Sequence, residues 1–157
     1  MCNCRRDCCR KRRCDRPVRV CGICSVQRGL RDLRNAICDL EEGICEVKKC
    51  NFCEGVRFIE RALRDLRRGL RDFREGLENT NFRIRCRRKR ELEEAICDIE
   101  AAILDIERGL EEICEGDICG GTGTIEEAIE ILCDALEEIE NIIGFENKCD
   151  SCNQSGR

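Results

Sequence analysis

The chain has 157 residues, a length that suits one domain, and 39% of them are charged while 41% are hydrophobic. It has no His, Trp or Tyr, so it lacks the commonest general base and the Ser–His and Cys–His nucleophile pairs, and we expect no enzymatic activity. The net charge of −4 conceals a split, because residues 1–90 hold 26 Lys and Arg against 13 Asp and Glu, whereas residues 91–157 hold 3 against 20. Parts of such opposite charge can neutralise each other within one chain or pair head to tail between copies.

The cysteine content is the second unusual feature of the composition. The 18 cysteines exceed a tenth of the chain, which is typical of disulfide scaffolds and metal-thiolate proteins. No apolar run is long enough to span a bilayer, and the residues that follow Met1 lack the apolar core of a secretory signal. We therefore expect synthesis in the cytosol without a signal peptide, no membrane span, and thiols that either bind metal or oxidise later at an oxidising surface.

Residues 1–24 are predicted to form a cysteine-rich basic arm. They show neither helical nor strand periodicity, and Pro17 and Gly22 interrupt them. We expect the order of this arm to depend on crosslinks, metal or a partner. Its cysteines are Cys2, Cys4, Cys8, Cys9, Cys14, Cys21 and Cys24.

Four later stretches repeat apolar residues at alternating steps of three and four, which predicts packed helices. The expected helices cover residues 25–49, 54–78, 91–115 and 124–144. They predict an all-α fold, an antiparallel four-helix bundle within residues 25–145, followed by a Cys-x-x-Cys tail at 146–157. The segment Ala36–Leu40 recurs as Ala95–Ile99, which indicates a duplicated helical hairpin.

The predicted ends of these helices rest on local signals. Ser25 is the expected N-cap of the first helix, and Thr124 and Glu127 form a capping box for the fourth. Residues 82–90 begin with a brief alternation that favours a short extended piece. The glycine-rich residues 115–123 predict a turn.

A small residue precedes the first apolar residue of most heptads, the position called g. Glycine inside a helix costs about 1 kcal/mol relative to alanine, so we expect a neighbouring backbone to approach closely there. The alternative is that small residues only fill the bundle. The small positions are Gly29, Ala36, Gly43, Gly55, Ala62, Gly69, Gly76, Ala95, Ala102, Gly109, Ala128 and Ala135.

Five helical cysteines fall on the other edge of the apolar seam. Cys38 and Cys45 are two turns apart, about 10.5 Å along one helix, so they cannot bond to each other. Each of the five therefore needs a partner on another helix or in another molecule. These bundle-edge cysteines are Cys38, Cys45, Cys97, Cys114 and Cys133.

Metal binding is the alternative use of the thiols. Three Cys-x-x-Cys pairs have the spacing of zinc half-sites, and the crowded arm suits a copper(I) or zinc cluster. The alternative is therefore a thiolate metal-binding protein with zinc or copper(I) as its cofactor; otherwise we expect no cofactor. The candidate ligands are Cys21, Cys24, Cys50, Cys53, Cys149 and Cys152.

Crosslinked self-assembly accounts for most of these features together. Thiols at both ends of the chain, edge cysteines on a stiff bundle and opposite charges favour copies that align and are then locked by oxidation. We do not expect nucleic-acid binding, because the acidic helices compete for the basic segments. The candidates for intermolecular disulfides are Cys2, Cys4, Cys8, Cys9, Cys14, Cys149 and Cys152.

The arm from Cys2 to Cys24, the terminal Cys149 and Cys152, and the cysteine content resemble the cysteine-rich exosporium and spore-coat structural proteins of endospore-forming bacteria. The resemblance implies a structural role, self-association and a final place on the spore surface or in another extracellular layer. We therefore expect a disulfide-crosslinked layer or filament, with the chain itself and other cysteine-rich surface proteins as partners.

Overall fold

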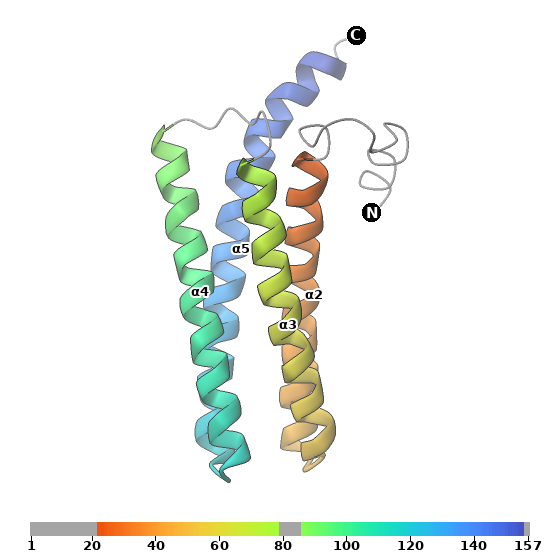
Figure 1. Cartoon of the computed structure of the whole chain (residues 1–157), viewed down its shortest axis with the longest axis vertical. Coiled ribbons are helices and arrows are strands. Elements are labelled where there is room, and N and C mark those ends of the chain that lie inside the picture. The colour runs from red at the N-terminus through yellow and green to blue at the C-terminus, as the bar shows by residue number, and fades with distance from the viewer. Residues whose placement is uncertain (1–21, 79–85, 156–157) are drawn as a thin grey trace.

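The computed structural model describes residues 22–78 and 86–155, which form four α-helices. They are α2 (Gly22–Lys48), α3 (Phe52–Glu78), α4 (Cys86–Cys114) and α5 (Ile118–Ser155). Each helix runs antiparallel to the next along the long axis of the bundle (Figure 1). The predicted all-α four-helix bundle is confirmed. Most of the predicted arm lies outside the described residues.

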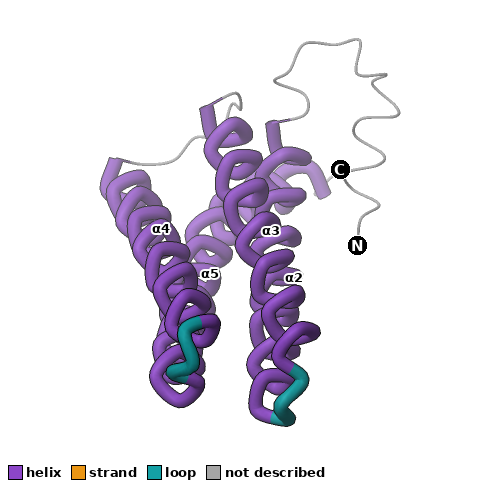
Figure 2. The backbone as a smooth tube through the Cα atoms, turned by 60° about the horizontal axis from the view of Figure 1, so that its bottom comes forward, coloured by secondary structure: helices purple, strands orange, loops and turns teal. Residues whose placement is uncertain are grey.

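The bundle consists of two helical hairpins. Three-residue turns join α2 to α3 and α4 to α5, and both turns lie at the same end of the bundle (Figure 2). Seven residues, 79–85, separate α3 from α4. The helices within each hairpin pack much more closely than the hairpins pack on each other. We call α2 with α3 the first hairpin and α4 with α5 the second hairpin.

Glycines explain the close packing within the first hairpin. A Cβ atom on Gly29 would lie 2.5 Å from the carbonyl oxygen of Gly69, and one on Gly43 would lie 2.9 Å from the carbonyl oxygen of Gly55. Side chains there would collide with backbone, so the two helices approach to a distance that only glycine permits. The predicted role of the small positions is confirmed for these four residues.

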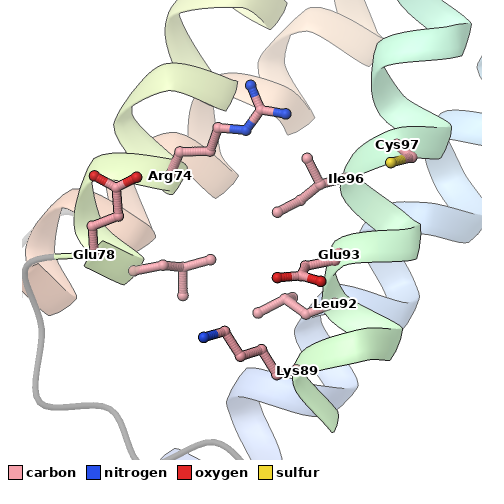
Figure 3. Close-up of a pocket in the computed structure, with 8 residues that line it drawn as sticks. Arg74, Glu78, Lys89, Leu92, Glu93, Ile96 and Cys97 are labelled. Atoms are coloured by element: carbon pink, nitrogen blue, oxygen red, sulfur yellow. The ribbon is translucent and has the colours of Figure 1, made fainter. Parts of the chain in front are cut away.

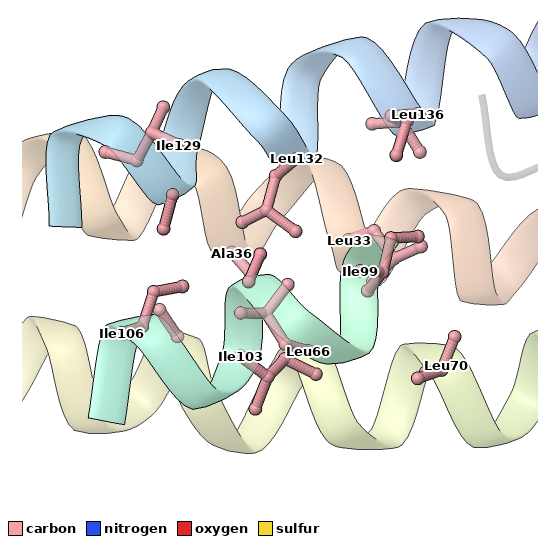
Figure 4. Close-up of a cluster of buried hydrophobic side chains, with 14 of the residues drawn as sticks. Leu33, Ala36, Leu66, Leu70, Ile99, Ile103, Ile106, Ile129, Leu132 and Leu136 are labelled. Carbon is pink, nitrogen blue, oxygen red and sulfur yellow. The ribbon is translucent and has the colours of Figure 1, made fainter. Parts of the chain in front are cut away.

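The core lies between the hairpins and receives apolar residues from all four helices (Figure 4). Most predicted seam residues are buried, while Ile37, Val56, Leu77 and Leu110 are only partly buried at its edge. The seam also extends further than the heptads indicated. Val26 is 0% exposed, and Ile142 is 1% exposed although it occupies a position where the other helices have Gly or Ala.

The first and third helices begin earlier than predicted. Helix α2 already begins at Gly22, so Ser25 is no N-cap; its hydroxyl accepts a hydrogen bond from Arg28 Nη2 at 3.2 Å inside the helix. Buried Val26 continues the packing face upstream, which supports the extra turn. Helix α4 begins at Cys86, so residues 86–90 are helical rather than extended; residues 82–85 lie outside the described residues.

The start of the last helix also differs from the prediction. Helix α5 begins at Ile118, so only residues 115–117 form the turn. Asp117 Oδ1 accepts a hydrogen bond from the Gly120 backbone N–H at 3.0 Å, which caps the new helix. Thr124 lies inside the helix and donates its hydroxyl proton to the Gly120 carbonyl oxygen at 2.9 Å. The predicted capping box is therefore wrong.

Tertiary packing accounts for the longer helix α5. A Cβ atom on Gly121 would lie 2.5 Å from the carbonyl oxygen of Gly109, so this glycine belongs to the small positions rather than to a loop. Because Gly109 and Gly121 pack as the glycines of the first hairpin do, the gain in packing offsets the poor helix propensity of this segment. Helix α5 also continues to Ser155, so the predicted tail is helical through that residue.

The two turns have the same hydrogen bonds, which supports the predicted duplication. The N–H of Asn51 donates to the Glu46 carbonyl at 2.8 Å, and the N–H of Asp117 donates to the Glu112 carbonyl at 2.8 Å. Both turns are thus Schellman motifs. This equivalence spans 66 residues. The repeated segment aligned Ala36 with Ala95, whereas the turns align Ala36 with Ala102, which is seven residues further along the chain.

Candidate functional site

Every thiol whose side-chain burial the structure describes lies on the surface. Cysteine is ordinarily among the most buried residue types, so this distribution is the reverse of the usual one. The five predicted bundle-edge cysteines are indeed outside the core; which residues they pair with stays a prediction. The exposed, free cysteines of the described part are Cys38, Cys45, Cys50, Cys53, Cys97, Cys114, Cys119 and Cys133.

Half of these thiols gather at the turn end of the bundle. Cys50 and Cys53 belong to the first turn region and Cys114 and Cys119 to the second, and the turns share one end (Figure 2). Cys53 and Cys114 line the same surface hollow of ≈ 700 Å³. Sequence reasoning missed Cys119 as a surface thiol of the bundle, because the glycines that follow it predict a turn. The signal that places Cys119 on a helix is the seven-residue spacing of Gly121, Ala128 and Ala135.

The other cysteines of the predicted crosslinking and metal sites are placed only by their backbone or not at all. Cys24 falls in α2, and Cys149 and Cys152 fall in α5. The remaining predicted arm cysteines lie outside the described residues: Cys2, Cys4, Cys8, Cys9, Cys14 and Cys21.

Helix length separates two of the proposed zinc half-sites. Cys24 lies near the start of α2 and Cys50 just beyond its end, about 39 Å apart along the helix axis. Zinc–sulfur bonds are about 2.3 Å long, so Cys24 and Cys50 cannot ligate the same ion within one chain. In residues 22–78 and 86–155, no three His, Cys, Asp or Glu side chains are grouped to hold a metal ion.

Cys133 has a distinctive electrostatic environment. Partial burial, and then the negative charges of Glu41, Asp134 and Glu130, raise the pKa of its thiol above the ordinary value. Both causes disfavour the thiolate. Since the thiolate is the nucleophile in disulfide formation, Cys133 is disfavoured as an attacking group.

We expect Glu41→Gln to speed the reaction of Cys133 with iodoacetamide at pH 7.5 by roughly two- to threefold. The raised pKa of this thiol leaves less thiolate at a fixed pH, and the substitution removes one of the negative charges that raise the pKa. Peptide mass spectrometry after timed alkylation measures the rate. Glu127→Gln, a charge change elsewhere on α5, is the control. An alkylation rate unchanged by Glu41→Gln, or raised equally by Glu127→Gln, would contradict the prediction.

The two hairpins differ in how charges face each other across their helices. The first hairpin has three Arg–Asp pairs between α2 and α3: Arg28–Asp72, Arg61–Asp39 and Arg68–Asp32, at 3.2–3.3 Å. The equivalent positions of the second hairpin hold only acidic residues: Glu94 and Glu138, Asp105 and Glu127, and Asp98 and Asp134. The first hairpin therefore neutralises the carboxylates at these positions with its own arginines, whereas the second hairpin leaves an acidic surface at the equivalent positions.

Ion pairs also join the two hairpins. Lys48 Nζ lies 2.8 Å from Glu126 Oε2, and this hydrogen bond, together with the attraction of the carboxylate, raises the pKa of the ammonium group. Four ion pairs between the hairpins have their cation on the first hairpin and their anion on the second. The four pairs are Lys48–Glu126, Arg34–Glu140, Arg67–Glu107 and Arg74–Glu100.

The bundle is hollowed between α3 and α4. A groove of ≈ 630 Å³ has Leu77, Leu92 and Ile96 among its lining residues, with Arg74 on one wall and Cys97 at the other (Figure 3). The next hollow along the same two helices, of ≈ 550 Å³, includes Leu104, which is 64% exposed. This face therefore presents apolar surface beside an exposed thiol.

Within the described part of the chain, no helix combines the length and the apolar character that crossing a bilayer requires. Comparisons with protein-family models, curated proteins and solved structures give no match to the chain.

Proposed function

We propose that the chain is a structural subunit that assembles with copies of itself and is then crosslinked by disulfides into a layer or filament. One observation carries the proposal: the eight cysteines whose side chains the structure describes are all exposed and free, although cysteine is usually buried. The proposed setting is the spore surface or another extracellular layer, with other cysteine-rich surface proteins as further partners. The resemblance of the arm and the terminal cysteines supports that setting.

The backbone of Cys50 gives independent support. Its φ of 72° lies in the left-handed region, whereas the equivalent residue of the second hairpin is Gly116, with φ 104°. A side chain in this conformation costs about 1 kcal/mol, and glycine is the usual residue at this position of a Schellman motif. A thiol retained at such a cost is consistent with a role for that thiol.

The chemistry needs only an oxidant of ordinary kind. Two thiols form one disulfide when they lose two protons and two electrons to molecular oxygen. Alternatively, one protein thiolate attacks glutathione disulfide and releases one glutathione, and a second protein thiolate then attacks the mixed disulfide and releases the other glutathione. Stiff bundles favour this reaction between molecules, because exposed thiols on a rigid surface meet those of a neighbour repeatedly in the same geometry.

Oxidation of the full-length protein tests the proposal. We expect glutathione disulfide to give a ladder of oligomers on a non-reducing gel, which dithiothreitol collapses to one band. Replacing seven arm and tail cysteines by Ser should reduce the crosslinked fraction by about tenfold, whereas replacing the five bundle-edge cysteines by Ser should leave most of the ladder. The two variants change Cys2, Cys4, Cys8, Cys9, Cys14, Cys149 and Cys152, or Cys38, Cys45, Cys97, Cys114 and Cys133.

A single monomer band after oxidation would overturn the proposal. Elemental analysis of protein purified without oxygen separates it from the metal-binding alternative, since one or more zinc or copper ions per chain would favour that alternative instead.

A further inference from the structure

Each hairpin is a closely packed unit. Its helices touch through glycine backbones, and a three-residue turn joins them. The contact between the two hairpins is looser and consists of apolar side chains with ion pairs at its edges. The bundle therefore separates most easily into two intact hairpins, along the surface that we call the inter-hairpin interface.

The inter-hairpin interface has the same spacing on both of its sides. Arg34 and Lys48 are 14 residues apart on α2, as are their partners Glu140 and Glu126 on α5. On the other side, the two arginines of α3 are seven residues apart, and so are their partners on α4: Arg67 and Arg74, and Glu107 and Glu100. Because the register is whole heptads on both sides, a hairpin from another molecule would meet the same apolar residues and the same charges.

The charges determine which hairpins can pair. The cations lie on the first hairpin and the anions on the second in all four ion pairs of this interface. Two first hairpins would oppose arginines and lysines, and two second hairpins would oppose glutamates. Repulsion between like charges disfavours both arrangements, so a first hairpin selects a second hairpin.

The connection between the hairpins is long enough to permit exchange. Helix α3 ends at Glu78 and α4 begins at Cys86, which leaves seven residues. Seven residues reach up to about 25 Å when extended, whereas neighbouring packed helices are only about 8–10 Å apart. The turns within each hairpin, with three residues, have no such reserve.

We propose that copies of this chain exchange hairpins, so that the first hairpin of one copy packs on the second hairpin of another through the inter-hairpin interface. The partner is a second copy of the chain, and repetition of the contact gives a head-to-tail assembly. This inference rests on the proposed function, because exchange supplies the non-covalent contact that disulfides then fix. Closure within one chain dominates in dilute solution, and exchange grows with concentration.

Two full-length charge variants, studied together in reducing buffer, test the exchange. In the acidic variant both hairpins are acidic at the inter-hairpin interface, and in the basic variant both hairpins are basic there. In either variant, the two hairpins of one chain therefore repel each other. Mixed in equal amounts, they should form species that contain both chains in a 1:1 ratio, in about tenfold or greater excess over self-associated species. Native mass spectrometry gives the composition and circular dichroism the helix content. The variants are R34E/K48E/R67E/R74E and E100K/E107K/E126K/E140K.

Two controls make the result specific. A chain with all eight changes restores the pairs with reversed signs and should behave as the unmodified protein. A second pair of variants carries the same net charges at exposed positions outside the four ion pairs and should not form 1:1 species; these are K49E/R57E/R64E/R71E and E111K/E115K/E130K/E137K.

Separate monomers of the two interface variants, with helix content unchanged by mixing, would overturn hairpin exchange. If either variant is poorly folded alone, the gain of helix on mixing becomes the measurement, and no gain overturns the inference equally. The mixing test is carried out in reducing buffer, so it is independent of the oxidation test. If 1:1 species form but oxidation gives no gel ladder, the crosslinking function alone is rejected. If oxidation gives a ladder but no 1:1 species form, hairpin exchange alone is rejected.

Discussion

Replacing Gly121 by alanine should destabilise the bundle by about 1–3 kcal/mol, although alanine is the better helix former. The new Cβ atom would lie 2.5 Å from the carbonyl oxygen of Gly109 and 3.0 Å from the backbone nitrogen of Ile113. Backbone atoms cannot rotate away as side chains do, so α4 and α5 must move apart and lose contacts along their length. Urea denaturation followed by circular dichroism measures the loss.

Gly123 provides the matched control two residues later in the same helix. A Cβ atom there would meet nothing within 4 Å. Gly123→Ala should therefore stabilise the protein by about 0.5–1 kcal/mol through helix propensity alone. Opposite signs at the two positions are the expected result. Stabilisation by both substitutions would show that the helices of the second hairpin are not in backbone contact.

Replacing Phe73 by alanine should have the larger effect, a loss of about 3–5 kcal/mol in the free energy of unfolding. Phe73 is 0% exposed, and its backbone nitrogen would lie 2.9 Å from a Cβ atom on Gly29. Its ring thus fills the core beside one of the closest backbone approaches. The cavity that alanine leaves can collapse only slightly, because the glycine contact already holds the two helices together.

Phe52 is the control for this second substitution. It is 42% exposed at the start of α3, so Phe52→Ala should change the stability by less than about 1 kcal/mol. Both variants are measured by the same denaturation experiment. Similar losses for Phe52→Ala and Phe73→Ala would contradict the assignment of Phe73 to the core.

The difference in charge between the hairpins bears on both proposals. Each hairpin repeats the same packing, yet the Arg–Asp pairs that join the two helices of the first hairpin, such as Arg61–Asp39 at 3.2 Å, have only acidic residues at the equivalent positions of the second. The second hairpin needs cations from elsewhere, and within the described residues Lys48 and three arginines of the first hairpin supply some of them. A duplicated unit whose halves carry opposite charges at their shared interface is suited to pairing with its complement, within a chain or between chains.

Local patterns in the sequence were sufficient for much of this architecture. A heptad spacing concerns residues within two turns of one helix, so the four helices, their apolar seam and the exposed edge of Cys38, Cys45 and Cys97 could be predicted without knowledge of any partner helix. Small residues at every seventh position likewise indicated close packing. The crosslinking role of the thiols stays a prediction, because it depends on contacts between molecules.

Only the tertiary structure decided what depends on the pairing of distant segments. The glycine-rich start of α5 has poor intrinsic helix propensity, and it is helical because Gly121 packs against the backbone of Gly109 on another helix. The left-handed backbone of Cys50 follows from the turn that antiparallel packing imposes. The register that sets Lys48 against Glu126 is likewise a property of two hairpins together. Helix formation was therefore determined by short-range periodicity, while helix ends, glycine contacts and ion-pair partners were determined by packing across the bundle.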